Sequence, residues 1–124
     1  MGDYTQLRAW VLAQEVAADV HAATGEASGG FHELRDQLRR ASLSVPTNIA
    51  EGCDRGTDRE FARFLRIALS SASEVESLLC SAGKTGALPA QAVRDLAARV
   101  GLLRRMLRRL IDAIARTSAD ALRR

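Results

Sequence analysis

The residues best suited to chemistry are arginines near the C-terminal end of the sequence. Residues 89–124 carry nine arginines against three aspartates. Arg104 and Arg108 are four positions apart, so a helix would align them. Arg105 and Arg109 repeat that spacing beside them, which predicts one basic ridge. Such a ridge either binds the phosphates of a nucleic-acid backbone or is an ordinary solvated helix face. The candidate nucleic-acid-binding residues are Arg104, Arg105, Arg108 and Arg109, with Arg94 and Arg99 as lesser candidates.

The charge distribution places this basic character in the second half of the chain. Residues 1–54 hold four arginines against eight acidic residues, a net charge of −4, and residues 55–124 hold fourteen basic against seven acidic residues, a net charge of +7. No aromatic residue is interleaved with the C-terminal arginines, and no recognition-helix motif is present. Any nucleic-acid binding should therefore tolerate changes in nucleic-acid sequence.

A second group of polar residues lies within residues 37–52, QLRRASLSVPTNIAEG. Arg40, Ser44, Asn48 and Glu51 recur at helical spacing beside an apolar line, and Pro46 interrupts both. If this helix and the next form an antiparallel pair, positions whose numbers sum to about 114 lie at the same height. That register predicts two ion pairs between the helices.

The first predicted pair joins Glu51 to Arg63, and the second joins Arg40 to Glu74. These polar residues either fix the register of two packed helices or face a partner subunit. Truncation of Asn48 separates the two interpretations. A large loss of stability favours the register role, and loss of assembly with a stable monomer favours the partner.

Catalytic and metal-binding patterns are missing from the sequence. The only histidines are His21 and His32, and neither follows a glutamate by three positions, as a di-iron bundle requires. Neither lies a few residues after an arginine, which excludes small helical ribonucleases built on that pair. The glycines at 25, 29 and 30 do not follow a strand, so they make no nucleotide-binding motif. We expect no enzyme activity, no catalytic residue, no metal and no cofactor.

Two cysteines, Cys53 and Cys80, flank opposite ends of the predicted third helix and are therefore too far apart to pair. Thiols of this kind are typical of the reducing cytoplasm. No window reaches the roughly 20 apolar residues of a membrane span, and the N-terminus has no apolar signal core. The sequence predicts a cytoplasmic protein that does not enter a membrane.

Apolar residues at three-and-four spacing predict helices at about 5–24, 31–51, 58–82 and 89–116, with residues 117–124 frayed. Short connections force neighbouring helices to run alternately up and down, so the fold class is all-α, an up-and-down antiparallel four-helix bundle in one domain, 1–124. Pro46 should kink the second helix, although two separate helices broken at 44–46 are the alternative. Gly52 is expected to end the second helix, and Gly83 and Gly86 are expected to stop the third.

Residues 38–52 meet the pattern LRRAxxSxPxNIAEG, which includes Pro46 and Gly52. With Arg55, Phe61 and Glu74, this pattern resembles a bacterial four-helix bundle family that includes the intervening-sequence-encoded proteins of large-subunit ribosomal RNA genes. It is also similar to the accessory variability determinant of diversity-generating retroelements. The resemblance implies a non-enzymatic, ring-like homopentamer with a basic surface. For the accessory proteins it implies binding to nucleic acid and to a reverse transcriptase.

The sequence therefore predicts a non-catalytic, oligomeric helical bundle that binds RNA or DNA largely through backbone phosphates and has no small-molecule substrate. The alternative is a scaffold that binds only proteins, through the wide apolar arc of the third or fourth helix. Phosphate contacts predict an affinity that falls steeply with salt, which distinguishes the two. The sequence does not tell which branch of the family this is, whereas a neighbouring reverse transcriptase gene would identify the accessory-protein branch.

Overall fold

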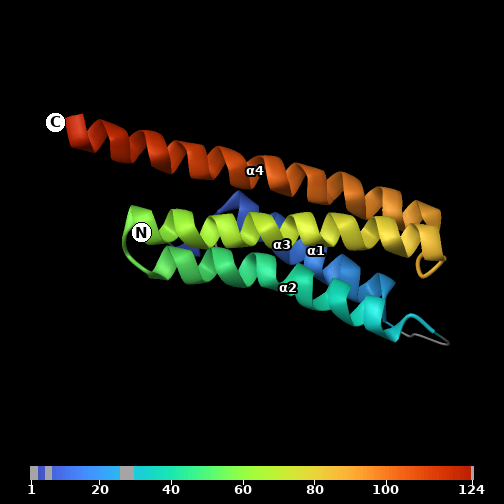
Figure 1. Ribbon diagram of the computed structural model, residues 1–124. Helices are drawn as coiled ribbons and strands as arrows, with labels where there is room; N and C mark the ends of the chain where they lie inside the picture. The colour runs from blue at the N-terminus through green and yellow to red at the C-terminus, as the bar shows by residue number, and fades with distance from the viewer. Residues whose placement is uncertain (1–2, 5–6, 26–29, 124) are drawn as a thin grey trace.

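The computed structural model describes residues 3–4, 7–25 and 30–123. Within them the chain forms four helices and no strand, which confirms the predicted all-α class (Figure 1). The helices are α1 (Arg8–Ala23), α2 (His32–Asp54), α3 (Asp58–Thr85) and α4 (Ala90–Arg123). Residues 5 and 6, predicted to open the first helix, lie outside the described residues. No described helix is both long enough and apolar enough to cross a membrane.

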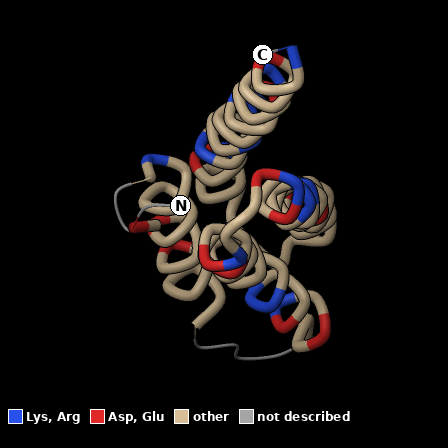
Figure 2. Tube along the Cα trace, turned by 90° about the vertical axis from the view of Figure 1, so that its left-hand side faces the viewer, with Lys and Arg blue, Asp and Glu red and all other residues tan. Residues whose placement is uncertain are grey.

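The four helices form a ring of neighbours. In the described residues α1 packs against α2 and α4, and α3 packs against the same two helices, whereas the diagonal pairs do not pack together. Successive helices run in opposite directions (Figure 1), and the view along the bundle shows the four tubes around one centre (Figure 2). This is the up-and-down antiparallel bundle that the short connections predict.

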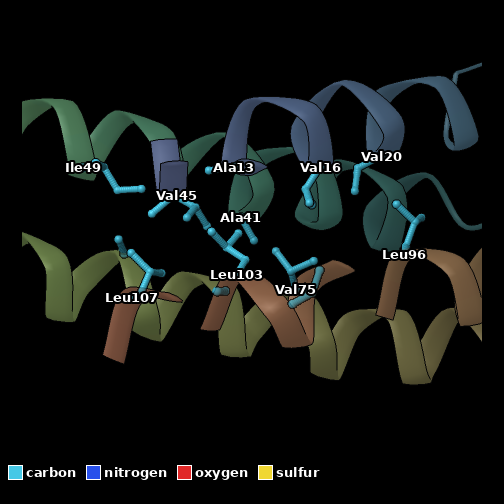
Figure 3. Close-up of a cluster of buried hydrophobic side chains, with 14 of the residues drawn as sticks. Ala13, Val16, Val20, Ala41, Val45, Ile49, Val75, Leu96, Leu103 and Leu107 are labelled. Carbon is cyan, nitrogen blue, oxygen red and sulfur yellow. The ribbon is translucent and has the colours of Figure 1, made fainter. Parts of the chain in front are cut away.

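The core lies between the helices and is built almost entirely from aliphatic side chains. Each helix supplies residues at three-and-four spacing, such as Val16 from α1, Ile49 from α2, Val75 from α3 and Leu103 from α4, and these side chains point toward one another (Figure 3). Leu38, Ile49, Leu65, Leu79 and Leu107 are fully buried. Burying a leucine side chain contributes about 1.5–3 kcal/mol, so this stripe carries most of the stability.

Three predicted helix ends are wrong, each for a local reason. α2 continues through Gly52 to Asp54. α3 continues through Gly83 and is capped by Gly86, whose φ of +81° lies in the left-handed region that favours glycine. α4 does not fray at residue 117 but runs to Arg123. The last eight residues are rich in alanine, leucine and arginine, which favour a helix even where the apolar stripe has ended.

Pro46 lies inside α2, which remains one helix, so the alternative of two separate helices is wrong. The axis of α2 changes direction along its length (Figure 1). Proline donates no hydrogen bond to the Ser42 carbonyl, which loosens this turn. The next two side chains add bonds there, since Thr47 Oγ1 donates to Leu43 O at 2.8 Å and Asn48 Nδ2 donates to Ser44 O at 2.8 Å.

Candidate nucleic-acid interface

The outer face of α4 carries the exposed arginines. Arg105, Arg108 and Arg109 are exposed, and none of them forms a hydrogen bond or ion pair with a described residue. We call these three residues the arginine surface. α4 holds no acidic residue between Asp95 and Asp112, and Asp112, one turn after Arg108, forms no ion pair with a described arginine. Arginine positions, blue on the tube, recur along α4 in Figure 2.

Arg104 differs from its neighbours because it faces α3. Its Nη1 atom donates to both carboxylate oxygens of Glu76, at 3.0 and 3.1 Å, and only 22% of its side chain is exposed. The structure therefore separates Arg104 from the predicted ridge. Sequence spacing missed this difference, because spacing along one helix does not tell which side of a basic stripe meets the neighbouring helix.

Arg99 lies on the opposite side of α4, against α1. Its guanidinium forms ion pairs with Glu15, at 3.0 Å, and with Asp19. Arg94 is exposed near the start of α4, where its Nη2 donates to Gln91 Oε1 at 2.9 Å. Both Arg99 and Arg104 thus tie α4 to its neighbours, and of the six candidates the structure brings together Arg105, Arg108 and Arg109.

One cation that sequence reasoning missed adjoins the arginine surface. Arg8, the first residue of α1, is exposed and without a partner in the described residues. It lines the same shallow groove as Arg109, between the start of α1 and the middle of α4. No sequence signal pairs positions 8 and 109. Only the up-and-down topology, which places the first helix beside the last, could have suggested it.

The polar line of α2 packs against α3 in the predicted register. Ser44 Oγ lies 2.9 Å from Ser71 Oγ, one residue from the predicted height, and Asn48 Nδ2 also donates to Ser44 Oγ at 3.0 Å. Ser44 and Asn48 are half-buried. Within the monomer, this part of the line therefore forms a satisfied contact between two helices.

The two ion pairs predicted from that register do not form. Glu51 pairs with Arg55 at 2.7 Å, and Arg63 pairs with Glu60 at 2.7 Å. The described residues include no ion pair between Arg40 and Glu74, and both side chains are exposed. Glu51 and Arg63 lie on the outer sides of α2 and α3, where an opposite charge one turn along the same helix is nearer than the one across the pair.

Gly52 of the family pattern is buried and has a packing role. A Cβ atom at this position would lie 2.6 Å from Phe64 Cβ and 3.2 Å from Phe61 Cδ1. Contacts under 3.0 Å are essentially never made by a real Cβ atom. Glycine therefore lets α2 and α3 approach closely at this end of the bundle, and its role here is packing rather than ending the helix.

Groups for acid–base or metal chemistry are dispersed. The described residues contain no cluster of three or more His, Cys, Asp or Glu side chains able to hold a metal ion. Cys53 is buried near the end of α2 and Cys80 is exposed on α3, and neither is in a disulfide. Burial, and secondly the charge of Asp54, raise the pKa of the Cys53 thiol. A raised pKa disfavours the reactive thiolate.

Comparison with known proteins places this architecture. A crystal structure of a protein of unknown function from the S23 ribosomal protein family of Bacteroides thetaiotaomicron is similar, with a TM-score of 0.75 and 19% sequence identity over 84% of this chain and 95% of that one. At that identity the likeness shows the fold alone. No curated protein matched the chain. The model of the 23S rRNA-intervening sequence protein family matches residues 5–109, and the chain belongs to that family.

Proposed function

We propose that this protein is a non-enzymatic, oligomeric helical bundle that binds RNA or DNA through backbone phosphates. The observation that carries the proposal is the arginine surface: three exposed guanidinium groups within five residues of α4, without a carboxylate partner in the described part of the chain. Cations with no partner in the protein lose no ion pair when they bind phosphate. They release the counterions of the nucleic acid, which favours association.

The six arginines predicted from the sequence enter this proposal unequally. Arg105, Arg108 and Arg109 make the main phosphate contacts, and Arg94 extends the surface toward the start of α4. Arg99 and Arg104 would have to leave Asp19 and Glu76 before they bound a phosphate. We therefore assign them to the stability of the bundle and only secondarily to binding.

The alternative, a scaffold that binds only proteins, would need a continuous apolar patch. The exposed large apolar residues of the described chain instead lie on all four helices and just before α2: Val11 on α1, Phe31 before α2, Leu43 on α2, Ile67 on α3, and Leu102 and Leu122 on α4. Single exposed apolar residues are ordinary on a protein surface. The distribution of exposed groups therefore favours phosphate over an apolar protein partner.

Assembly and partners follow from the family resemblance. We propose a homopentamer, in which five arginine surfaces would add their phosphate contacts, and a cytoplasmic role as an accessory to a reverse transcriptase or in an rRNA-associated context. Light scattering at micromolar concentration tests the assembly, and a monomer would contradict it. A reverse transcriptase gene beside this one would select the accessory role.

Binding is tested by fluorescence anisotropy with a labelled RNA and a labelled DNA across a salt series. We expect affinity to fall steeply with salt. The variant Arg105→Ala/Arg108→Ala/Arg109→Ala should reduce the slope of log K against log salt by roughly two to three. The matched control, Arg40→Ala/Arg59→Ala/Arg66→Ala, removes the same charge from exposed positions on α2 and α3 and should change the slope much less. An affinity independent of salt would contradict the proposal.

A further inference from the structure

The groove between α1 and α4 combines an apolar floor with two cations at its rim. Among the described residues, Met106, Leu110 and Arg109 of α4 line the groove together with Leu7, Arg8 and Ala9 from the start of α1. Met106, Leu7 and Leu110 are partly buried against the core, so their remaining surface forms the floor. Both arginines are exposed and make no hydrogen bond or ion pair with a described residue.

From this arrangement we propose that the protein binds single-stranded nucleic acid, with one unstacked base on the floor of the α1–α4 groove and the adjacent phosphates on Arg8 and Arg109. The inference rests on the proposed function and adds to it the strandedness of the ligand. In a duplex, each base is stacked and paired, so its flat apolar face is hidden. In a single strand that face is accessible, and apolar side chains can cover it without reading the base sequence.

Two features favour a single strand in the groove: the positive charge of the groove and its continuity with the arginine surface. Arg109 belongs to the groove and to the arginine surface, and Arg105 lies one helical turn before it, about 6 Å along α4. A strand that places a base in the groove can therefore run on along α4 with its phosphates against further arginines. A small apolar anion would use the groove alone and leave Arg105 and Arg108 unoccupied.

The chemistry of the floor fits a base better than a second apolar helix. Its exposed surface comes from a thioether and short aliphatic groups, and Met106 offers a polarisable sulfur to an aromatic ring. The two guanidinium groups would repel a basic partner and favour one that carries negative charge. An acidic amphipathic peptide has the same negative charge as a nucleic acid and is the alternative occupant, so the experiment below includes it as a competitor.

The test compares a labelled single strand with a duplex that contains the same strand, at one salt concentration. We expect tighter binding to the single strand. Met106→Ser should weaken binding of the single strand by up to about tenfold, the loss expected for one sulfur–aromatic contact, and leave the duplex unchanged. Leu102→Ser is the matched control, because Leu102 is an exposed apolar residue one turn earlier on α4 and does not line the groove. Arg8→Ala, at an exposed position that does not contribute to the core, should weaken the single strand selectively.

Each outcome is distinguishable. Equal affinity for single strand and duplex, with Met106→Ser and Arg8→Ala affecting both alike, would overturn this inference and leave the proposed function standing. Absence of binding to either ligand would overturn both. If an acidic peptide of alternating glutamate and leucine competes as strongly as the unlabelled single strand, the groove is a protein-docking site and the inference is wrong. Thermal unfolding of each variant confirms that the bundle is intact.

Discussion

Gly52 of α2 lies directly against Phe64 of α3, where a Cβ atom on residue 52 would stand 2.6 Å from the Phe64 Cβ. Phe64 is itself buried, and the guanidinium carbons of Arg55 and Arg63 lie 5.0 and 4.5 Å from its ring centroid. The ring is therefore enclosed by a helix backbone and two cations. The Phe64 Cβ is bonded to the α3 backbone, so rotation of the side chain does not relieve a clash at that atom.

We predict that Gly52→Ala lowers the free energy of unfolding by about 1–3 kcal/mol, since the added methyl group overpacks this contact. Urea unfolding measures the loss. Gly83→Ala is the control, because a Cβ there would meet Val93 at an ordinary 3.5 Å. Alanine has the higher helix propensity, so this control should be neutral or stabilise by up to about 1 kcal/mol. Equal stability of the two variants would remove the packing role of Gly52.

The close approach at Gly52 also shows where sequence reasoning reached its limit. Apolar spacing identified the four helices and their core faces, and the antiparallel register came within one residue at Ser44 and Ser71. A glycine near a predicted helix end, however, has the same appearance whether it caps the helix or admits a neighbouring ring. The distinction depends on a distance between two helices that local sequence does not encode.

The same limit explains the arginines of α4. Spacing aligned Arg104 with Arg108 correctly along the helix, but the partner of each arginine depends on the neighbouring helices. Glu76 reaches Arg104 from a position 28 residues earlier, and Asp19 reaches Arg99 from 80 residues earlier. The groove between Arg8 and Arg109 likewise exists only after the bundle has closed.

Substitutions of the adjacent residues Arg104 and Arg105 should have different effects, the first mainly on stability and the second mainly on nucleic-acid binding. Arg104→Ala removes the ion pair with Glu76 and should lower the free energy of unfolding by about 1 kcal/mol. A double-mutant cycle with Glu76→Ala isolates the pair and should give a coupling of about 0.5–1 kcal/mol. Arg105→Ala should leave stability within about 0.5 kcal/mol and weaken nucleic-acid binding more than Arg104→Ala does. The reverse order of the two binding losses would contradict the assignment of Arg104 to the bundle.

Asn48 should matter for stability through its contact with Ser44. Its Nδ2 atom donates to the Ser44 carbonyl and hydroxyl, and that hydroxyl also meets Ser71. Asn48→Ala should cost about 1 kcal/mol in urea unfolding, because half-buried acceptors lose their donor. Thr47→Ala is the control, since Thr47 is exposed and its acceptor, the Leu43 carbonyl, has no link to α3, and it should cost less than about 0.5 kcal/mol. A stable Asn48→Ala monomer that no longer assembles would instead place this line at a subunit interface.

Cys53 should make the bundle less stable in alkali. Burial raises the pKa of its thiol in the folded protein above the ordinary value of about 8.5. As pH rises through the ordinary value, the Cys53 thiol of the unfolded chain ionises, whereas the same thiol in the folded protein keeps its proton. The unfolded state is thereby favoured, by at most about 1.4 kcal/mol per pH unit between the two pKa values, and stability present below pH 8.5 is lost above it.

Urea unfolding between pH 7.5 and 10.5 measures this loss. Cys53→Ala should be less stable at pH 7.5, because it leaves a small cavity, but its stability should fall less with pH than that of the native chain. Cys80→Ala is the control for loss of a cysteine as such, since Cys80 is exposed on α3. If Cys53→Ala and the native chain lose stability in parallel, some other group is responsible for the alkaline transition. If the profile flattens only in Cys53→Ala, the buried thiol is the group that titrates.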